Sequence, residues 1–333
     1  MKKLNIAVIG LGRIARLIHL PLISGLTNFS INAVSDIDKN KLKSVSEKFK
    51  IKNAFTDYTE CFQNDEIDLV IISTPTILHK EIALHCINCG KNVLIEKPIA
   101  RNHKEAFEIV EAAKKKRVSV FIGMNMRFRP DLMLLKSILS SNEIGNPFFL
   151  KCRWFRRQSS DAAWFVRKED AGGGVMLDLG IVLLDIALWL LDFEEIVSVS
   201  AQNYSINTKS VEDTSICLLR NKNDATISIE TSWSIEEEND SFCLEVFGSK
   251  GSVSLTPQQL NKVINNRKIE LTSSGSVKTE ELYKKSYSNQ LKHIAGLIDR
   301  GVVTCNGAEE SLYTMKIVEK IYKSAVQKEE IKL

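Results

Sequence analysis

The chain has almost no excess of charge of either sign. Among its 333 residues, 45 lysines and arginines stand against 41 aspartates and glutamates, which gives a net charge of +4. Proteins that bind nucleic acid more often concentrate basic residues on one surface. The one basic run, at 114–117, ends a predicted helix, where cations complement exposed carbonyl groups. We therefore expect no nucleic-acid partner.

Long apolar runs are lacking too. The longest, at 181–193, contains Asp185 and Asp192 and is too short to span a bilayer. The apolar start of the chain is short, is broken by glycines and meets Arg13 without the small-residue cleavage site of a signal peptide. These features predict a cytoplasmic protein with no membrane partner.

Cysteines at the spacing of a metal site are also scarce. There are seven cysteines, and this odd number in a long chain excludes a small disulfide-stabilised scaffold. Cys86 and Cys89 form a single C-x-x-C, whereas a structural zinc site would need two further ligands at matching spacing. Both cysteines fall on a predicted helix, so we expect no metal site.

What the sequence does have is the material for two globular domains. Hydrophobic residues make up 44% of the chain and charged residues 26%, and a domain takes about 150 residues. Over 1–123, apolar strands alternate with helix-length segments, which predicts a parallel sheet with right-handed crossovers, a doubly wound α/β domain of Rossmann type. The expected strands are 5–9, 31–35, 69–73, 92–95 and 118–122, and the expected helices are 16–26, 38–49, 80–90 and 103–116.

From residue 124 the pattern changes to long strands, several of which alternate polar and apolar residues. Such alternation is typical of an antiparallel sheet with one covered face. We expect an α+β domain over 124–333 whose exposed strands favour pairing with another subunit. Its predicted strands are 148–157, 196–204, 214–220, 225–234 and 241–247, with helices at 131–140, 289–299 and 308–326.

The turn after the first strand carries a dinucleotide fingerprint. Gly10, Gly12 and Ala15 form G-x-G-x-x-A between a strand and a helix, which suits a tight turn, close approach of a pyrophosphate and tight helix packing. Asp36 follows the second strand, 21 residues after Ala15, where a carboxylate can bind a ribose hydroxyl and repel a 2′-phosphate. The pattern favours NAD over NADP; the alternative for Asp36 is a turn residue or a helix cap.

A second glycine-rich stretch, 172–174, leads into an apolar helix that carries Asp178 and Asp185. If the helix already includes Asp178, then Val182, Asp185 and Trp189 share its face. Two carboxylates on an apolar helix are costly to bury without partners. Either Asp178 caps the helix and Asp185 pairs with an arginine, or at least one of them faces a polar cleft.

Six short motifs together resemble those of the glucose–fructose oxidoreductase, inositol dehydrogenase and rhizopine-catabolism (Gfo/Idh/MocA) family, over essentially the whole chain. They are G-x-G-R-x-A at 10–15, Thr74-Pro75 with His79, Glu96-Lys97-Pro98, Asn125 with Arg127-Phe128, Trp164-Phe165, and Gly172-Gly173-Gly174 followed by Asp178-Leu179-Gly180.

The resemblance implies a Rossmann domain followed by a domain with a large open sheet, which commonly forms a dimer or tetramer face. It implies oxidation of a secondary hydroxyl, or reduction of the ketone, on a pyranose, an inositol or a sugar nucleotide. It also implies a set of cofactor-binding residues. Gly10, Gly12, Arg13 and Ile14 would hold the pyrophosphate, Asp36 the ribose, and Thr74, Pro75 and His79 would line the dinucleotide cleft. Glu96 and Lys97 would stand beside the nicotinamide, with Pro98 often in a cis peptide, and Asn125 would close the cleft from below.

Hydride transfer also needs a group that exchanges the proton of the substrate oxygen. Lys97 is the candidate, because a lysine beside a cationic ring gives up its proton more readily; the alternative is a surface lysine paired with Glu96. The family pattern D-x-x-x-H begins here with Asp178 but has Val182 in place of the histidine, and valine cannot move a proton.

Three interpretations follow from this departure. Lys97 carries the proton with Asp178 in support, or another side chain such as Tyr204 or an arginine of 154–157 enters the site, or the protein is a non-catalytic NAD- and sugar-binding regulator. The substrate side is basic and aromatic, which would suit an anionic sugar; the alternative is that half of these residues lie on the outer face of the sheet. The candidates are Arg127, Trp154, Trp164, Lys168 and Val182.

Overall fold

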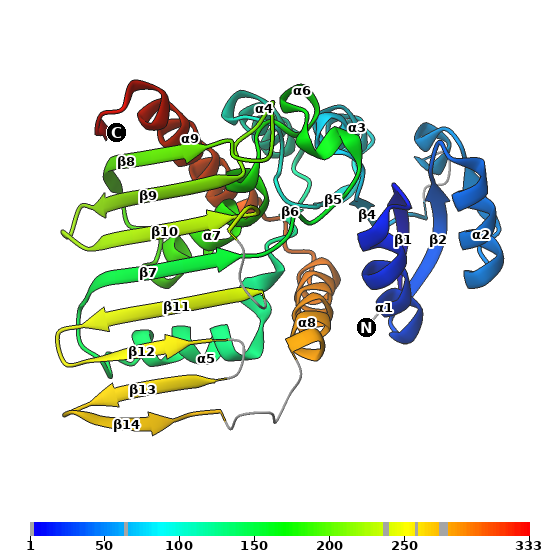
Figure 1. Ribbon diagram of the computed structural model, residues 1–333. Coiled ribbons are helices and arrows are strands. Elements are labelled where there is room, and N and C mark those ends of the chain that lie inside the picture. The colour runs from blue at the N-terminus through cyan, green and yellow to red at the C-terminus, as the bar shows by residue number, and fades with distance from the viewer. Residues whose placement is uncertain (1–2, 63–65, 236–239, 257–258, 273–278) are drawn as a thin grey trace. The chain divides into compact units, whose positions relative to one another are not determined.

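The computed structural model describes residues 3–62, 66–235, 240–256, 259–272 and 279–333. The chain divides into two compact units (Figure 1). Unit 1 comprises Met1–Gly123 and Tyr287–Leu312, and unit 2 comprises Met124–Ser286 and Tyr313–Leu333. The chain therefore changes unit after Gly123 and returns to unit 1 for residues 287–312.

Unit 1 contains the predicted parallel sheet. Every strand pair is parallel. The strand order is β3-β2-β1-β4-β5-β6. From β1 the chain adds strands first on one side and, from β4 onward, on the other, so the switch point of the fold lies between β1 and β4. The central strands consist mostly of apolar residues and have no exposed residue, which is why they alternate so little in sequence. The strands are β1 (Leu4–Ile9), β2 (Phe29–Ser35), β3 (Asn53–Phe55), β4 (Leu69–Ile72), β5 (Asn92–Ile95) and β6 (Val120–Ile122).

The helices of unit 1 begin where their sequences predict. Asp38 caps α2 by accepting hydrogen bonds from the backbone of Asn40 and Lys41, and Asn102 caps α4 in the same way. From Tyr287 onward, α8 packs three apolar residues into the core beside β1. The helices are a π-helical turn (Ala15–His19) followed by α1 (Leu20–Gly25), α2 (Lys39–Phe49), α3 (His79–Asn88), α4 (His103–Lys116), α8 (Thr279–Asp299) and the start of α9 (Asn306–Gln327).

Unit 2 is built on a nine-stranded sheet of order β14-β13-β12-β11-β7-β10-β9-β8-β15. It is antiparallel throughout except for the parallel pair β7–β10, so the predicted mostly antiparallel α+β architecture is confirmed. The strands are β7 (Pro147–Phe155), β8 (Ile196–Tyr204), β9 (Thr214–Asn221), β10 (Thr226–Ser232), β11 (Ser241–Gly248), β12 (Gly251–Leu255), β13 (Leu260–Ile264), β14 (Arg267–Glu270) and β15 (Ile331–Lys332).

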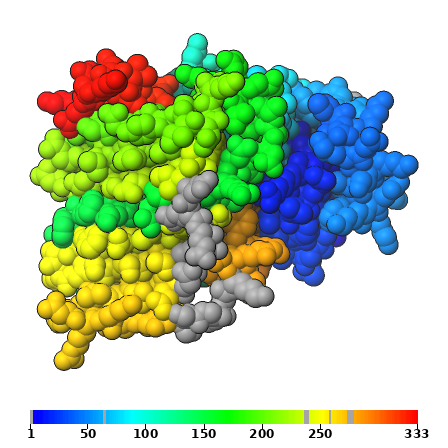
Figure 2. Space-filling model, in the orientation of Figure 1, coloured from blue at the N-terminus to red at the C-terminus, as the bar shows by residue number. Residues whose placement is uncertain are grey.

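One side of this sheet is covered by helix, and the other, called the open face below, exposes side chains of the described strands. On the covered side, α7 (Ile181–Leu190) packs against β7 and β10, and Cys217 and Leu219 of β9 are 1% exposed. On the other side, Ile216 and Leu218 of the same strand are 44% and 51% exposed. The space-filling view shows β8 to β14 forming a broad surface (Figure 2).

The remaining helices of unit 2 are α5 (Pro130–Ser140), α6 (Lys168–Ala171) and a π-helical turn (Met176–Gly180) that runs into α7. The helical run Lys168–Leu190 is long and apolar enough to cross a membrane by length and composition, but 94% of its apolar window is buried within the protein. Its apolar character is thus accounted for by packing beneath the sheet.

Candidate functional site

The glycine-rich turn of unit 1 is fixed by its neighbours. Gly10 has a φ of +88°, and a Cβ there would lie 2.7 Å from the carbonyl oxygen of Ser73, so only glycine fits. The hydroxyl of Ser73 donates to the carbonyl of Gly10 at 2.8 Å. At Gly12 the nearest described atom to a Cβ would be the carbonyl oxygen of Ser73, 3.8 Å away. The protein itself leaves space at Gly12, which is the space that a pyrophosphate approaching the backbone requires.

Asp36 extends from the end of β2 toward this turn. Its Oδ2 accepts a hydrogen bond from the backbone N–H of Leu11 at 2.7 Å, and its Oδ1 accepts from that of Asp38 at 2.9 Å. Asp36 is therefore a turn residue, while Asp38 is the cap of α2. Each oxygen of a carboxylate has a second lone pair, so Asp36 can hold the turn and still accept from a ribose hydroxyl.

The segment after β4 carries the next predicted residues. Thr74 and Pro75 are half-buried, and the hydroxyl oxygen of Thr74 is buried without a hydrogen-bond partner among the described residues. A buried polar atom without a partner is costly and is often satisfied by water or a ligand. His79, the first residue of α3, is 1% exposed and faces two carbonyl oxygens, those of Pro98 at 2.9 Å and Thr74 at 3.0 Å. Burial lowers its pKa.

The Glu96–Lys97–Pro98 motif follows β5, and its Lys97–Pro98 peptide is cis. Glu96 is 7% exposed, and its Oε1 lies 2.7 Å from Nε2 of His19. A Cβ on Gly123 would lie 2.9 Å from Oε2 of the same carboxylate. Glu96 thus faces the protein interior, whereas Lys97 is half-buried.

These residues gather at one edge of the sheet. Gly10 follows β1, Asp36 follows β2, Thr74 follows β4 and Lys97 follows β5. Because these strands are parallel and adjacent, their carboxyl ends lie together, at the point where the strand order reverses. Ligands of doubly wound sheets bind at this position. Arg13 is exposed and Ile14 is half-buried in the same turn.

In unit 2, the three glycines are required by backbone conformation or by packing. Gly172 ends α6 with a φ of +87°, and a Cβ at Gly173 or Gly174 would overlap Tyr322 or the backbone of Glu212. The carboxylate of Glu212 accepts hydrogen bonds at Oε1 from the backbone of Gly174 and Met176, both at 3.0 Å, and from the Tyr322 hydroxyl at 2.9 Å. Burial raises the pKa of Glu212. The glycines allow the turn before Asp178 to close onto this carboxylate.

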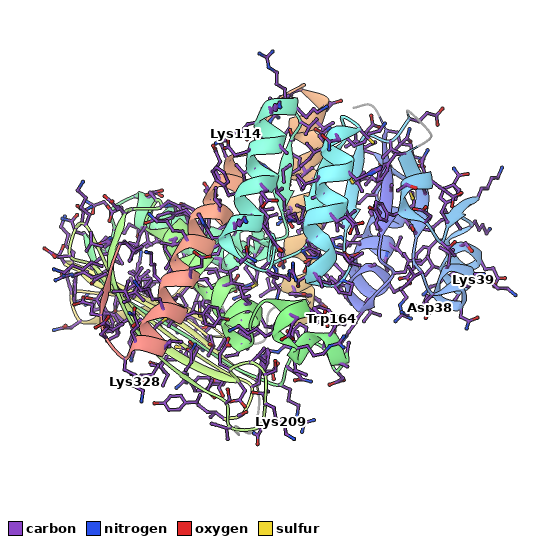
Figure 3. The ribbon with its side chains drawn as sticks, turned by 90° about the horizontal axis from the view of Figure 1, so that it is seen from above. Asp38, Lys39, Lys114, Trp164, Lys209 and Lys328 are labelled. Carbon is purple, nitrogen blue, oxygen red and sulfur yellow. The ribbon has the colours of Figure 1, made fainter. Side chains whose placement is uncertain are left out.

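Asp178 lies within the π-helical turn and does not cap the helix. It is 3% exposed. Its Oδ2 accepts hydrogen bonds from the Ser159 hydroxyl at 2.7 Å and from Trp233 Nε1 at 3.1 Å. Trp233 also belongs to a row of aromatic rings. The ring centroid of Phe165 lies 5.6 Å from that of Trp233, and the centroid of Trp164 lies 5.3 Å from that of Phe165. Figure 3 labels Trp164 on its helical turn.

Asp185 pairs with an arginine, which was one of the two alternatives that the sequence left open. Arg127 donates to it through two nitrogens, with Nε 2.7 Å from Oδ2, and the guanidinium also stacks on Phe193. Val182, one turn before Asp185, is 7% exposed. Asp185 is therefore not a residue of a polar cleft, and the guanidinium of Arg127 is held by a buried carboxylate.

The other predicted residues lie elsewhere in unit 2. Asn125 is 6% exposed, and its side-chain amide donates to the Ser286 hydroxyl at 2.7 Å. Trp154 on β7 makes an edge contact with Phe242, with ring centroids 5.5 Å apart. Lys168 is exposed at the start of α6.

His19, Ser159 and Trp233 are among the residues of these clusters that were not expected from the sequence. His19 lies on an apolar helical segment and Ser159 in an irregular stretch, where neither the spacing nor the residue type is informative. Trp233 follows the last residue of β10, and this strand-end position is the only signal that could have identified it.

Comparisons with known proteins match both units. A family described as oxidoreductases with an NAD-binding Rossmann fold matches residues 4–124, and the GFO/IDH/MocA C-terminal domain matches residues 132–254. The chain is 27% identical to myo-inositol 2-dehydrogenase of Thermotoga maritima, over 99% of this chain and 98% of that protein. It is 30% identical to glucose-6-phosphate 3-dehydrogenase of Bacillus subtilis, over 75% and 73%.

Solved structures give the same fold. Levoglucosan dehydrogenase in complex with NADH and levoglucosan superposes with a TM-score of 0.87 at 20% identity, covering 99% of both chains. Aldose–aldose oxidoreductase from Caulobacter crescentus superposes with a TM-score of 0.89 at 24% identity, covering 100% of both chains.

Proposed function

The chain belongs to the GFO/IDH/MocA family of NAD-binding oxidoreductases, and we propose that it transfers hydride between NAD and a secondary alcohol or ketone of a sugar, an inositol or a sugar nucleotide. Relatives named as inositol, glucoside and sugar-phosphate dehydrogenases support this substrate class. The observation that carries the proposal is the gathering of Gly10, Asp36, Thr74 and Lys97 at one sheet edge. In this proposal, residues 1–123 bind the cofactor and residues 124–333 bind the substrate.

The residues of unit 1 fit a dinucleotide. Gly12 leaves room for the pyrophosphate, Asp36 keeps acceptor capacity for a ribose, and the buried Thr74 hydroxyl needs a partner. NAD bound there supplies the acceptor or donor of the hydride. We infer a preference for NAD over NADP, because the carboxylate of Asp36 would repel a 2′-phosphate.

Lys97 is the proposed proton donor and acceptor. A secondary alcohol loses its hydroxyl proton when it is oxidised, and a ketone gains one when it is reduced. Lys97 stands half-buried at the carboxyl end of β5, on the sheet edge that we assign to the cofactor. The lysine Nζ can therefore hold the proton at the substrate oxygen and exchange it with water.

Asp178 is the proposed support for this step on the substrate side. Its carboxylate orientation is fixed by Ser159 and Trp233, so it can accept a hydrogen bond from a substrate hydroxyl in one defined direction. Trp164, Phe165 and Trp233 offer ring faces on which a pyranose can stack. Trp154 and Lys168 remain candidates for substrate contact, and Arg127 remains one although Asp185 holds it.

Val182 supports a second candidate function. The residue stands where the family pattern has a histidine, and a protein that lacks this group could be a non-catalytic regulator that binds NAD and a sugar. Val182→His tests which interpretation holds, with Val182→Asn as the control for a polar group at this buried position. If Lys97 moves the proton, the histidine changes the pH–rate profile only modestly; a large gain in rate in Val182→His alone would favour the impaired or regulatory protein.

The experiment that tests the function is a turnover assay with NAD and NADP against sugars, inositols, sugar phosphates and sugar nucleotides, read as the absorbance of the reduced cofactor. Binding of NADH is measured in parallel by fluorescence. The proposal predicts turnover of at least one such compound and includes anionic sugars among the candidates. Tight NADH binding without turnover across the panel would contradict it and favour the regulator.

We also propose that the open face of the sheet of unit 2 joins subunits in a homodimer or homotetramer. Tyr204, Ile216 and Leu218 expose 48%, 44% and 51% of their surface on β8 and β9, and exposed apolar strand surfaces commonly pair. Light scattering after gel filtration is predicted to show an oligomer in the parent protein and a smaller species in Leu218→Lys. Phe107→Lys, at an exposed residue of α4, is the control.

A further inference from the structure

Lys97 lies between two residues that are each held by a different buried histidine. On its N-terminal side, the side chain of Glu96 meets Nε2 of His19 at 2.7 Å. On its C-terminal side, the carbonyl of Pro98 meets Nδ1 of His79 at 2.9 Å. The exposed fractions of His19 and His79 are 0% and 1%.

The two histidines come from two other segments of the proposed cofactor edge, those that follow β1 and β4. His19 ends the π-helical turn that follows the glycine-rich turn. His79 begins α3, directly after the Thr74–Pro75 segment, and its Nε2 faces the carbonyl of Thr74 at 3.0 Å. The turn that carries Lys97 is thus connected by side chains to the segments that follow β1 and β4.

The geometry around each ring indicates which nitrogen carries the proton. For His19, Nδ1 is buried without a hydrogen-bond partner among the described residues, so Nε2–H is the donor, to the carboxylate of Glu96. Its ring also packs edge-on against Tyr287, with centroids 5.4 Å apart. For His79, the bond to Pro98 is buried whereas the one to Thr74 is partly exposed. A buried carbonyl without a donor costs more than one that water reaches, so Nδ1–H donates to Pro98.

We propose that His19 and His79 are positioning residues that fix the Glu96–Lys97–Pro98 turn, and through it the ammonium group of Lys97. His19 acts through Nε2 on Glu96, and His79 acts through Nδ1 on Pro98. This inference adds to the proposed proton transfer by Lys97, but the arrangement of the turn can be tested without any substrate.

The test replaces each histidine with asparagine or glutamine, whose side-chain amides differ in length. The side-chain nitrogen of asparagine can occupy the place of histidine Nδ1, and that of glutamine the place of Nε2. His79→Asn and His19→Gln therefore keep the bond that the proposal requires, whereas His79→Gln and His19→Asn lose it. His85→Asn and His85→Gln serve as controls, because His85 lies on α3 with its ring among those of Tyr58 and Phe62.

Amide hydrogen exchange of the full-length protein without substrate is measured for peptides that cover 95–101. His79→Gln and His19→Asn are expected to speed exchange of this segment about tenfold or more, while His79→Asn, His19→Gln and the His85 variants stay near the parent protein. With a turnover substrate, the first two variants are also expected to lose about tenfold in kcat, and His19→Asn is expected to do so with little change in NADH affinity.

Equal behaviour of asparagine and glutamine at both positions, whether harmless or damaging, would overturn the proposal. So would faster exchange across the whole of unit 1 in His79→Gln and His19→Asn, because that result would indicate general destabilisation. If no sugar is turned over but the exchange pattern appears, the positioning role holds and the proposed reaction fails.

Discussion

The indole of Trp233 donates a hydrogen bond from Nε1 to Oδ2 of Asp178 across 3.1 Å. The same oxygen accepts from the Ser159 hydroxyl at 2.7 Å. Donors from two separate segments therefore set the orientation of the carboxylate of Asp178, a residue that is 3% exposed. In the proposed reaction, this orientation decides where a substrate hydroxyl is held.

Trp233→Phe keeps the aromatic ring and removes only the N–H donor. A hydrogen bond to a charged group contributes about 1.5–3 kcal/mol, so we expect kcat/KM to fall at least about tenfold and the melting temperature to fall by a few degrees. Trp189→Phe, at a half-buried ring of α7 under Lys136, is the control. An unchanged kcat/KM in Trp233→Phe would show that the orientation of Asp178 by Trp233 does not contribute to the reaction.

Cofactor preference depends on the charge of Asp36. Asp36→Asn keeps an oxygen that can accept from Leu11 or Asp38 but removes the repulsion of a 2′-phosphate. Calorimetry is expected to show that the parent protein binds NAD more tightly than NADP and that the variant narrows this ratio about tenfold. Tighter binding of NADP than of NAD by the parent protein would contradict the assignment.

The glycine stretch before Asp178 is predicted to be intolerant of side chains. In Gly174→Ala the new Cβ would overlap the backbone of Glu212, and crowding of a packed interior costs about 1–3 kcal/mol or more of unfolding free energy. Gly307→Ala is the matched control, since no atom of the described residues lies within 4 Å of its Cβ position in α9, and alanine there stabilises a helix by up to about 1 kcal/mol. Equal stability of the two variants in urea would contradict the packing account.

The raised pKa of Glu212 is expected to make the free energy of unfolding depend on pH. Burial raises its pKa above the ordinary value of 4.5, so the folded protein binds this proton more tightly than the unfolded chain. The contribution of Glu212 is therefore fully present below about pH 4.5 and is lost as the pH rises through the raised pKa.

Glu212→Gln keeps an oxygen for Gly174, Met176 and Tyr322 but does not titrate. The free energy of unfolding of the parent protein is expected to fall, relative to that of Glu212→Gln, as the pH rises above about 4.5. Parallel pH curves for the two proteins, or a relative gain in stability of the parent with rising pH, would contradict this assignment.

The fold could be predicted because its signals are local. Apolar runs such as that of β1 and the caps Asp38 and Asn102 mark element boundaries directly in the sequence. The return of 287–312 to unit 1 was not expected, because a helix that leaves one unit and joins another has no local pattern. The strands β12 to β14 were also not expected, since they are short and β14 is exposed along its whole length.

The site could be predicted only at the level of motifs. The glycine-rich turn and Asp36 lie at fixed spacing after strands, so sequence places them at one edge. The residues that orient Glu96 and Asp178 cannot be found from spacing. His19 and Glu96 are 77 residues apart in the sequence, and Trp233 and Asp178 are 55 apart. The pairing of Asp185 with Arg127 was one of two open alternatives, and the choice depended on a contact over 58 residues.

The most direct test of the central claim is the turnover of Lys97→Met beside Lys104→Met, whose lysine is exposed on α4. The account predicts that Lys97→Met loses about a hundredfold or more in kcat and binds NADH as the parent protein does, while Lys104→Met keeps the parent rate. A kcat of Lys97→Met close to that of the parent protein would show that another group moves the proton.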